Sequence, residues 1–177
     1  MIKISFSNHE IMVVKEMAES VCIGGKSHIY KDNNERNKNI FENQFSGQLG
    51  ELALFKYYSI DGFEQYKHCR NEKNKNKSVG DDGYDIPNIK LDIKCSNWKY
   101  NKPAEEYHLY VREREYHLDW SYILSLAKQE METWNVYMVG WCKTKDLKMV
   151  KFEDDVRYEI LGKNLKKLPE RNEYKNL

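Results

Sequence analysis

The sequence has few of the features that mark secreted, membrane or zinc-binding proteins. Its four cysteines, in a chain of 177 residues, form no C-x-x-C pair and have no neighbouring histidine at zinc-finger spacing, so we expect reduced thiols. The amino-terminal stretch "MIKISFSNHEIMVV" lacks the apolar core of a signal peptide. No run approaches the roughly eighteen apolar residues of a membrane helix. These absences favour a soluble intracellular protein with no membrane partner.

Proline and net charge are also scarce. Only three prolines occur, whereas Lys, Asn, Ile and Tyr are abundant, which favours an AT-rich bacterial or phage coding sequence and a cytoplasmic location. The 29 Lys and Arg residues nearly balance the 28 Asp and Glu residues, so no overall positive field indicates a nucleic-acid partner. Any charged partner must therefore bind to a local patch.

The length supports one globular domain, because a second complete core would be cramped in a chain of this size with 40% hydrophobic residues. Within this domain we expect an amino-terminal helix and connector over 1–38, a core over 39–150 and a carboxy-terminal extension over 151–177. The first boundary follows the polar stretch "KDNNERNKN".

Two helices are predicted in the first third of the chain. Ser7 and Glu10 have the spacing of a capping box, and apolar residues then recur at helical spacing, which predicts a helix over 8–22. The polar stretch 31–39 has no periodicity and indicates a loop or connector. From about residue 48 a second helix carries apolar residues on more than one face, so we expect it to be largely buried.

Three residues stand out in this second helix. Gly47 and Gly50 each cost roughly 1 kcal/mol relative to alanine in a helix interior, which indicates a close approach of another element. Glu51 is an acid on an otherwise apolar helix. It is either a functional carboxylate or a partly buried structural acid paired with an arginine or lysine.

Residues 66–83 open as a possible strand and continue as a basic, asparagine-rich loop. Such a loop is either solvated or binds a nucleic-acid backbone, and both interpretations remain open. Its basic residues, which oppose only Glu72 before the Asp81–Asp82 pair, are Lys67, Arg70, Lys73, Lys75 and Lys77.

The remaining chain is dominated by strand signals, so the fold class is mixed α/β. Pro87 and Asn88 form a natural turn between the first two of these strands. Residues 145–150 and 156–168 indicate short mixed elements, followed by a loosely held tail. The predicted strands are 84–86, 89–95, 107–111, 120–126 and 135–142.

The stretch "YDIPNIKLDIKCS" concentrates charge in a predicted strand pair. Strand alternation places Asp92 and Lys94 on one face, and a hairpin through the turn would bring Asp85 close to Asp92. Two adjacent carboxylates repel unless a proton or cation lies between them, and oxygen ligands favour Mg²⁺ or Mn²⁺. That arrangement suits phosphodiester hydrolysis. The alternative is a cross-face ion pair on an exposed strand, worth only about 0–1 kcal/mol.

The combination resembles the PD-(D/E)XK nuclease superfamily over roughly residues 40–150. The matching pieces are "GQLGELALFKYY", "GDDGYDI" and "LDIKCS". The resemblance implies a restriction-endonuclease-like core, with a central mixed sheet of four to five strands flanked by helices. It also implies a Mg²⁺-dependent deoxyribonuclease, expected to be an endonuclease, that acts in restriction, in degradation of host DNA by a phage, or in DNA repair and recombination.

The same resemblance implies the roles of individual residues. Asp85, Asp92 and Glu51 would be the catalytic metal ligands, and Lys94 would be the catalytic lysine. Tyr84 replaces the proline of the family motif, and Asp92 stands where glutamate is more usual. Asp82 is the alternative to Asp85 as the first ligand.

Nucleic acid, expected to be DNA, would contact a helix residue one turn from Glu51, the basic loop, and the aromatic and basic loop after the D-x-K strand. Without a helix-turn-helix or zinc finger, specificity would come from loops or from a homodimer. The other hypotheses are a regulator that keeps the fold without turnover and an RNA-directed nuclease. The expected contacts are Gln48, Lys73, Lys75, Lys77, Trp98, Lys99 and Lys102.

Overall fold

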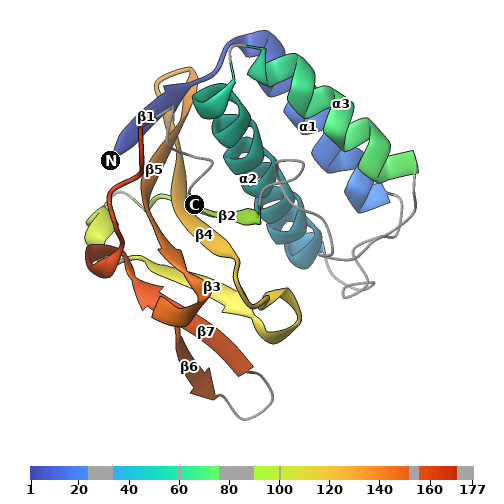
Figure 1. Ribbon diagram of the computed structural model, residues 1–177. Coiled ribbons are helices and arrows are strands. Elements are labelled where there is room, and N and C mark those ends of the chain that lie inside the picture. The colour runs from blue at the N-terminus through green and yellow to red at the C-terminus, as the bar shows by residue number, and fades with distance from the viewer. Residues whose placement is uncertain (24–33, 60, 76–89, 100, 152–155, 171–177) are drawn as a thin grey trace.

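The computed structural model describes residues 1–23, 34–59, 61–75, 90–99, 101–151 and 156–170 (Figure 1). Within these residues the chain forms three α-helices, which are α1 (Asn8–Ile23), α2 (Asn34–Tyr58) and α3 (Gly62–Lys75). It also forms seven strands, which are β1 (Ile2–Ser5), β2 (Leu91–Asn97), β3 (His108–Arg112), β4 (Ser121–Glu130), β5 (Thr133–Lys143), β6 (Lys148–Lys151) and β7 (Val156–Leu161).

The strands make two sheets. The larger sheet has the order β1-β5-β4-β2, in which β2 runs parallel to β4 and the other neighbours are antiparallel. The smaller sheet, in the order β3-β7-β6, is antiparallel throughout. The prediction of a mixed α/β fold is therefore confirmed, and the larger sheet has four of the predicted four to five strands; a restriction-endonuclease-like core stays a prediction. The first and the last described strands each join a sheet: β1 pairs with β5 in the larger sheet, and β7 pairs with β3 in the smaller one.

The three helices lie together on one side of the four-stranded sheet (Figure 1). Helix α2 is the central one and buries Leu49, Leu52 and Leu54 completely. A Cβ at Gly50 would lie 2.6 Å from the Cβ of Cys95, so the close approach predicted for this turn occurs between α2 and β2. A Cβ at Gly47 would meet no described atom within 4 Å, so the prediction is not met there.

The opposite side of the larger sheet faces a second apolar cluster. Tyr122, Leu124 and Leu126 of β4 pack there with Leu109 and Val111 of β3. The alternation of strand side chains produces this division, since neighbouring residues of one strand enter different clusters. Strand β2 follows the same rule: Leu91 and Ile93 enter the helix-side cluster, which leaves Asp92 and Lys94 on the other face.

Four predicted strands are present as β2 to β5 with shifted ends, and α1 matches the predicted helix over 8–22. The shorter predicted elements near 145–150 and 156–168 contain β6 and β7. None of the predicted strands lies at the position of β1. The predicted strand 84–86 and the turn after it lie outside the described residues.

Two predictions in the helical layer are wrong. Residues 34–39 belong to α2 instead of the loop predicted over 31–39, and residues 66–75 belong to α3 instead of the possible strand and basic loop predicted over 66–83. The apolar residues of α3 recur every three positions at Phe63, Tyr66 and Cys69, and Tyr66 is fully buried in the helix-side core. Packing of this narrow stripe stabilises a helix whose other residues are mostly polar.

Candidate functional site

Asp92 and Lys94 lie on β2, an edge strand of the described larger sheet, on the face that points away from the helices. In the parallel register of β2 with β4, Asp92 stands beside Tyr122 and Lys94 beside Leu124. The Nζ atom of Lys94 lies 2.8 Å from Oδ2 of Asp92, and the two side chains are 23% and 17% exposed. They therefore form a partly buried ion pair instead of the exposed pair of the alternative interpretation.

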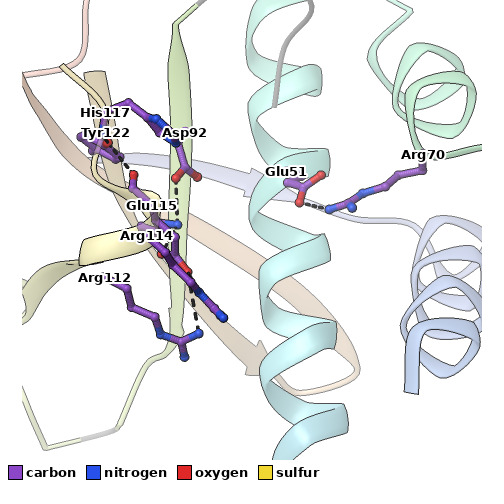
Figure 2. A network of polar contacts seen from close by, with 9 residues as sticks. Glu51, Arg70, Asp92, Arg112, Arg114, Glu115, His117 and Tyr122 are labelled. Carbon is purple, nitrogen blue, oxygen red and sulfur yellow. Dashed lines mark hydrogen bonds and ion pairs between the residues drawn. The ribbon is translucent and has the colours of Figure 1, made fainter. Parts of the chain in front are cut away.

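Glu115 is a third member of this group that the sequence did not reveal. Lys94 Nζ donates a hydrogen bond of 2.7 Å to Oε2 of Glu115, which ends the short 3₁₀ helix Glu113–Glu115 after β3. Tyr122 holds this turn in place: its hydroxyl donates to the Glu115 backbone oxygen and accepts a hydrogen bond from the His117 N–H. Figure 2 shows Glu115 next to Asp92 and Tyr122. The only local signal is the alternation of arginine and glutamate in "RERE" at 112–115, just beyond a predicted strand.

Two arginines surround the Glu115 carboxylate. An Nη1 atom of Arg112 and the Nε atom of Arg114 lie 3.7 and 3.9 Å from Oε1 of Glu115. Both side chains are more than half exposed, at 57% and 61%. The partly buried carboxylates of the described group thus have two exposed guanidinium groups beside them. Figure 2 shows Arg112 and Arg114 beside Glu115, and guanidinium groups bind phosphate oxygens well.

The charges of this group support one another. Burial favours the neutral form of Lys94, but the nearby carboxylates of Asp92 and Glu115 outweigh burial and raise the pKa of the ammonium above its ordinary value. Burial likewise opposes ionisation of Glu115, yet Lys94 and then Arg112 and Arg114 hold its pKa below the ordinary value. At neutral pH Lys94 is a cation and Glu115 an anion. Lys94 is therefore suited to stabilise negative charge and unsuited to accept a proton.

Glu51 points in a different direction. It leaves α2 toward α3 and forms an ion pair with the guanidinium of Arg70 (Figure 2). The two side chains are 14% and 18% exposed. This is the geometry of a partly buried acid paired with an arginine, and the described contacts do not join Glu51 to Asp92 or Lys94. Its role as a metal ligand stays a prediction.

Gln48 lies one turn before Glu51 on α2 and is buried. Its side chain is almost fully enclosed, and Oε1 accepts a hydrogen bond of 2.6 Å from the hydroxyl of Tyr66 on α3. In this arrangement the amide links α2 to α3 in the interior. A contact between Gln48 and nucleic acid stays a prediction.

The remaining predicted ligand and the basic loop fall largely outside the described residues. Asp85, its alternative Asp82 and Lys77 lie there, as do the side chains of Lys73 and Lys75, whose backbone belongs to α3. Among the residues that are described, no group of three or more His, Cys, Asp or Glu side chains is placed to hold a metal ion. The predicted meeting of Asp85 and Asp92 thus stays a prediction.

The loop after β2 brings aromatic and basic side chains together. The indole N–H of Trp98 donates to the Lys102 backbone oxygen at 2.9 Å, and its ring lies edge-on to Tyr137 with centroids 4.8 Å apart. The backbone N–H of Lys99 donates to the Tyr107 hydroxyl. Lys128, which the sequence did not single out, places Nζ 5.4 Å from the Trp98 ring centroid. Trp98, Lys102 and Lys128 therefore lie together, and the contacts of Trp98, Lys99 and Lys102 with nucleic acid stay a prediction.

Comparison of the chain with protein-family models, curated proteins and solved structures gave no match. The class of protein is thus defined by the architecture itself, a mixed α/β fold with one four-stranded and one three-stranded sheet. In the part of the chain that is described, no helix combines the length and apolarity needed to cross a membrane.

Proposed function

We propose that the protein is a Mg²⁺-dependent deoxyribonuclease with a restriction-endonuclease-like core. The observation that carries the proposal is the contact between Asp92 and Lys94 on one face of β2, in the D-x-K order on which the family resemblance rests. The mixed four-stranded sheet, with α2 packed closely on β2 at Gly50, supports a scaffold of this kind.

The chemistry of the donors fits the proposed ion. Asp92 would hold it together with Asp85 and Glu51, because carboxylate oxygens are preferred ligands of Mg²⁺ and Mn²⁺. Asp92 and Glu115 already direct oxygens at a single positive charge, the Lys94 ammonium. When bound, such an ion supplies a more acidic water and offsets negative charge on the phosphodiester.

The chain's own cations would act on the substrate. The protonated Lys94 would stabilise negative charge that develops on the phosphoryl oxygens, and Asp92 and Glu115 fix the position of its ammonium. The exposed Arg112 and Arg114 would hold neighbouring phosphates of the DNA backbone at the rim. Glu115 is a positioning residue in this scheme because it acts through Lys94.

Cleavage assays test the proposal directly. Single- and double-stranded DNA would be incubated with Mg²⁺ or Mn²⁺, and we expect products that Asp92→Asn and Lys94→Gln abolish. Asp146→Asn is the matched control, because "DLK" at 146–148 has the same D-x-K pattern as "DIK" at 92–94 while Asp146 pairs with Lys166 on the surface. Cleavage that survives in Asp92→Asn would sink the assignment.

A second candidate is a nucleic-acid-binding regulator without turnover. One observation favours it: Lys94 already faces Asp92 and Glu115, and Glu51 already faces Arg70, so these acids have structural partners. This candidate predicts binding of DNA without metal-dependent products, and binding that Asp92→Asn leaves intact. An RNA panel in the same assay separates the RNA-directed nuclease from both.

A further inference from the structure

A pocket of about 340 Å³ opens beside the loop that follows β2. Trp98, Asn101, Lys102, Pro103 and Lys128 line it. Its walls combine an indole ring, a proline ring, one amide and two ammonium groups. Flat apolar walls favour a flat ligand, the amide can hydrogen-bond to the edge of such a ligand, and the ammonium groups favour a neighbouring anion. A nucleobase with its phosphates has all three properties.

The pocket lies on the same side of β2 as the Asp92–Lys94 pair. The backbone N–H of Trp98 donates to Ala127, so the parallel register with β4 continues past the end of the strand. Lys94, Ser96 and Trp98 therefore share one face by alternation, and Ser96 between them is exposed. The four residue steps from Lys94 to Trp98 span about 13 Å.

This separation suits one continuous strand of nucleic acid. Stacked nucleotides advance roughly 3.4 Å each, so about four of them, or fewer in an extended strand, cover the path from Lys94 to Trp98. A base in a duplex has both faces stacked and its edge paired, whereas an unpaired base can stack on an aromatic side chain.

Lys128 connects the pocket with a second hollow. This hollow, of about 580 Å³, extends across the ends of β1, β4 and β5 and includes Lys3 and Lys128 in its lining. Glu130 also lines it. Its Oε2 atom lies 2.8 Å from Nζ of Lys3 and its Oε1 atom 3.3 Å from Nζ of Lys128, so its negative charge is offset. A nucleic-acid strand that leaves the pocket lined by Trp98 thus meets a surface with two lysines.

We propose that the Trp98 pocket binds an unpaired base of single-stranded DNA, within about four nucleotides of the phosphate that faces Lys94. The part of this inference that concerns Lys94 rests on the proposed function. The base-binding part does not, because it can be measured without any metal and without cleavage.

The first experiment measures binding in a metal-free buffer with chelator. The probes are a labelled oligothymidylate and an oligonucleotide of the same length whose sugars lack bases, so that both carry the same phosphates. Wild-type protein should bind the oligothymidylate about tenfold more tightly than the abasic strand, the factor expected from loss of one base–aromatic stack. Trp98→Leu should remove this difference, and Lys128→Gln should weaken both probes alike.

A second measurement covers the case in which Trp98→Leu does not fold. Tryptophan fluorescence should be quenched when oligothymidylate binds, and Trp98→Phe should lose most of this quenching. Trp141→Phe is the matched control, because Trp141 is a partly buried tryptophan of the same sheet that packs with the helix-side core. It should retain the quenching.

The outcomes separate the two proposals. Equal affinity for both probes, or quenching that persists in Trp98→Phe, overturns the base pocket whatever the cleavage assay shows. Base-dependent binding that needs Trp98, in a protein that cleaves no substrate with metal, supports the pocket and contradicts the nuclease. RNA of the same sequence and a DNA duplex complete the panel; a duplex bound as tightly as the single strand also overturns the pocket.

Discussion

The two sides of β2 treat charge differently. On the helix side, Leu91 and Ile93 enter an apolar core. Among the charges there, those of Glu51 and Arg70 form a single ion pair between α2 and α3. On the other side, Asp92, Lys94 and Glu115 form a chain of three charges that ends in exposed arginines. A single pair neutralises itself, whereas the three-membered group keeps an excess negative charge that a rim of cations offsets.

The two groups differ in their ability to bind a ligand. In the Glu51–Arg70 pair each charge already has its partner within the protein, so Glu51 could bind a metal ion only if this pair opened. A group with excess charge and an exposed rim can exchange one partner for a ligand. Substitutions in one group at a time should therefore have different effects on stability and on activity.

The largest loss of stability is expected for Lys94→Met, which leaves two partly buried carboxylates without their cation. The free energy of unfolding should fall by about 3 kcal/mol, as found when one partner of a buried ion pair is removed. Urea denaturation measures it. The double variant Lys94→Met with Glu115→Gln is the control. It should recover part of the loss, because it also removes one of the carboxylates left without a cation. A loss below about 1 kcal/mol would place the group with ordinary surface pairs.

A loss of about 2 kcal/mol is expected for Gly50→Ala, because the new Cβ would lie 2.6 Å from Cys95 and force α2 away from β2. Gly47→Ala is its matched control on the same helix. It should stabilise the protein by about 0.5–1 kcal/mol, since nothing described lies near the new methyl group and alanine favours the helix. Urea denaturation of both variants checks the pair, and equal effects would contradict the close approach of α2 to β2.

For the pair on the helix side, Glu51→Gln and Arg70→Met should each cost about 1–3 kcal/mol, and the double variant should cost less than their sum. Denaturation of the four proteins gives the coupling. Cleavage by the same variants decides the role of Glu51. A purely structural acid predicts similar activity in both single variants, whereas a metal ligand predicts loss of activity in Glu51→Gln alone.

The smallest effect is a change in the pH dependence of stability. The pKa of Glu115 in the folded protein lies below its ordinary value of 4.5. Its contribution is therefore complete above about pH 4.5 and is lost as the pH falls through the lower folded pKa. Denaturation between pH 2 and 6 should show a shallower acid decline in Glu115→Gln than in the wild type.

Glu130→Gln is the control for this measurement. The pKa of Glu130 is lowered to about 2 by hydrogen bonds from Lys3 and Tyr137, but its side chain is 32% exposed, against 11% for Glu115. Salt at 0.5 M should remove most of the Glu130 effect and leave most of the Glu115 effect, because partly buried charges are screened less. Equal sensitivity to salt would contradict the burial of the Asp92–Lys94–Glu115 group.

The sequence predicted those features that depend on neighbours in the chain. Helix α1 begins with the capping box it indicated: the Ser7 N–H donates to Oε2 of Glu10, and the Glu10 N–H donates to Oγ of Ser7. The alternation of β2 likewise placed Asp92 and Lys94 on one face. Helix α3 was missed because its apolar stripe is narrow and its remaining residues are polar, so its stability depends on packing against α2.

Steric rules that act within a few residues therefore account for helix α1, for strands β2 to β5 and for the face of β2 on which Asp92 and Lys94 stand. The contact partners depend on tertiary packing: Glu115 for Lys94 and Arg70 for Glu51, each about twenty residues away along the chain, and Lys128 for Trp98. Such contacts depend on how sheets and helices pack, and no local pattern of residues encodes a distance between separate elements.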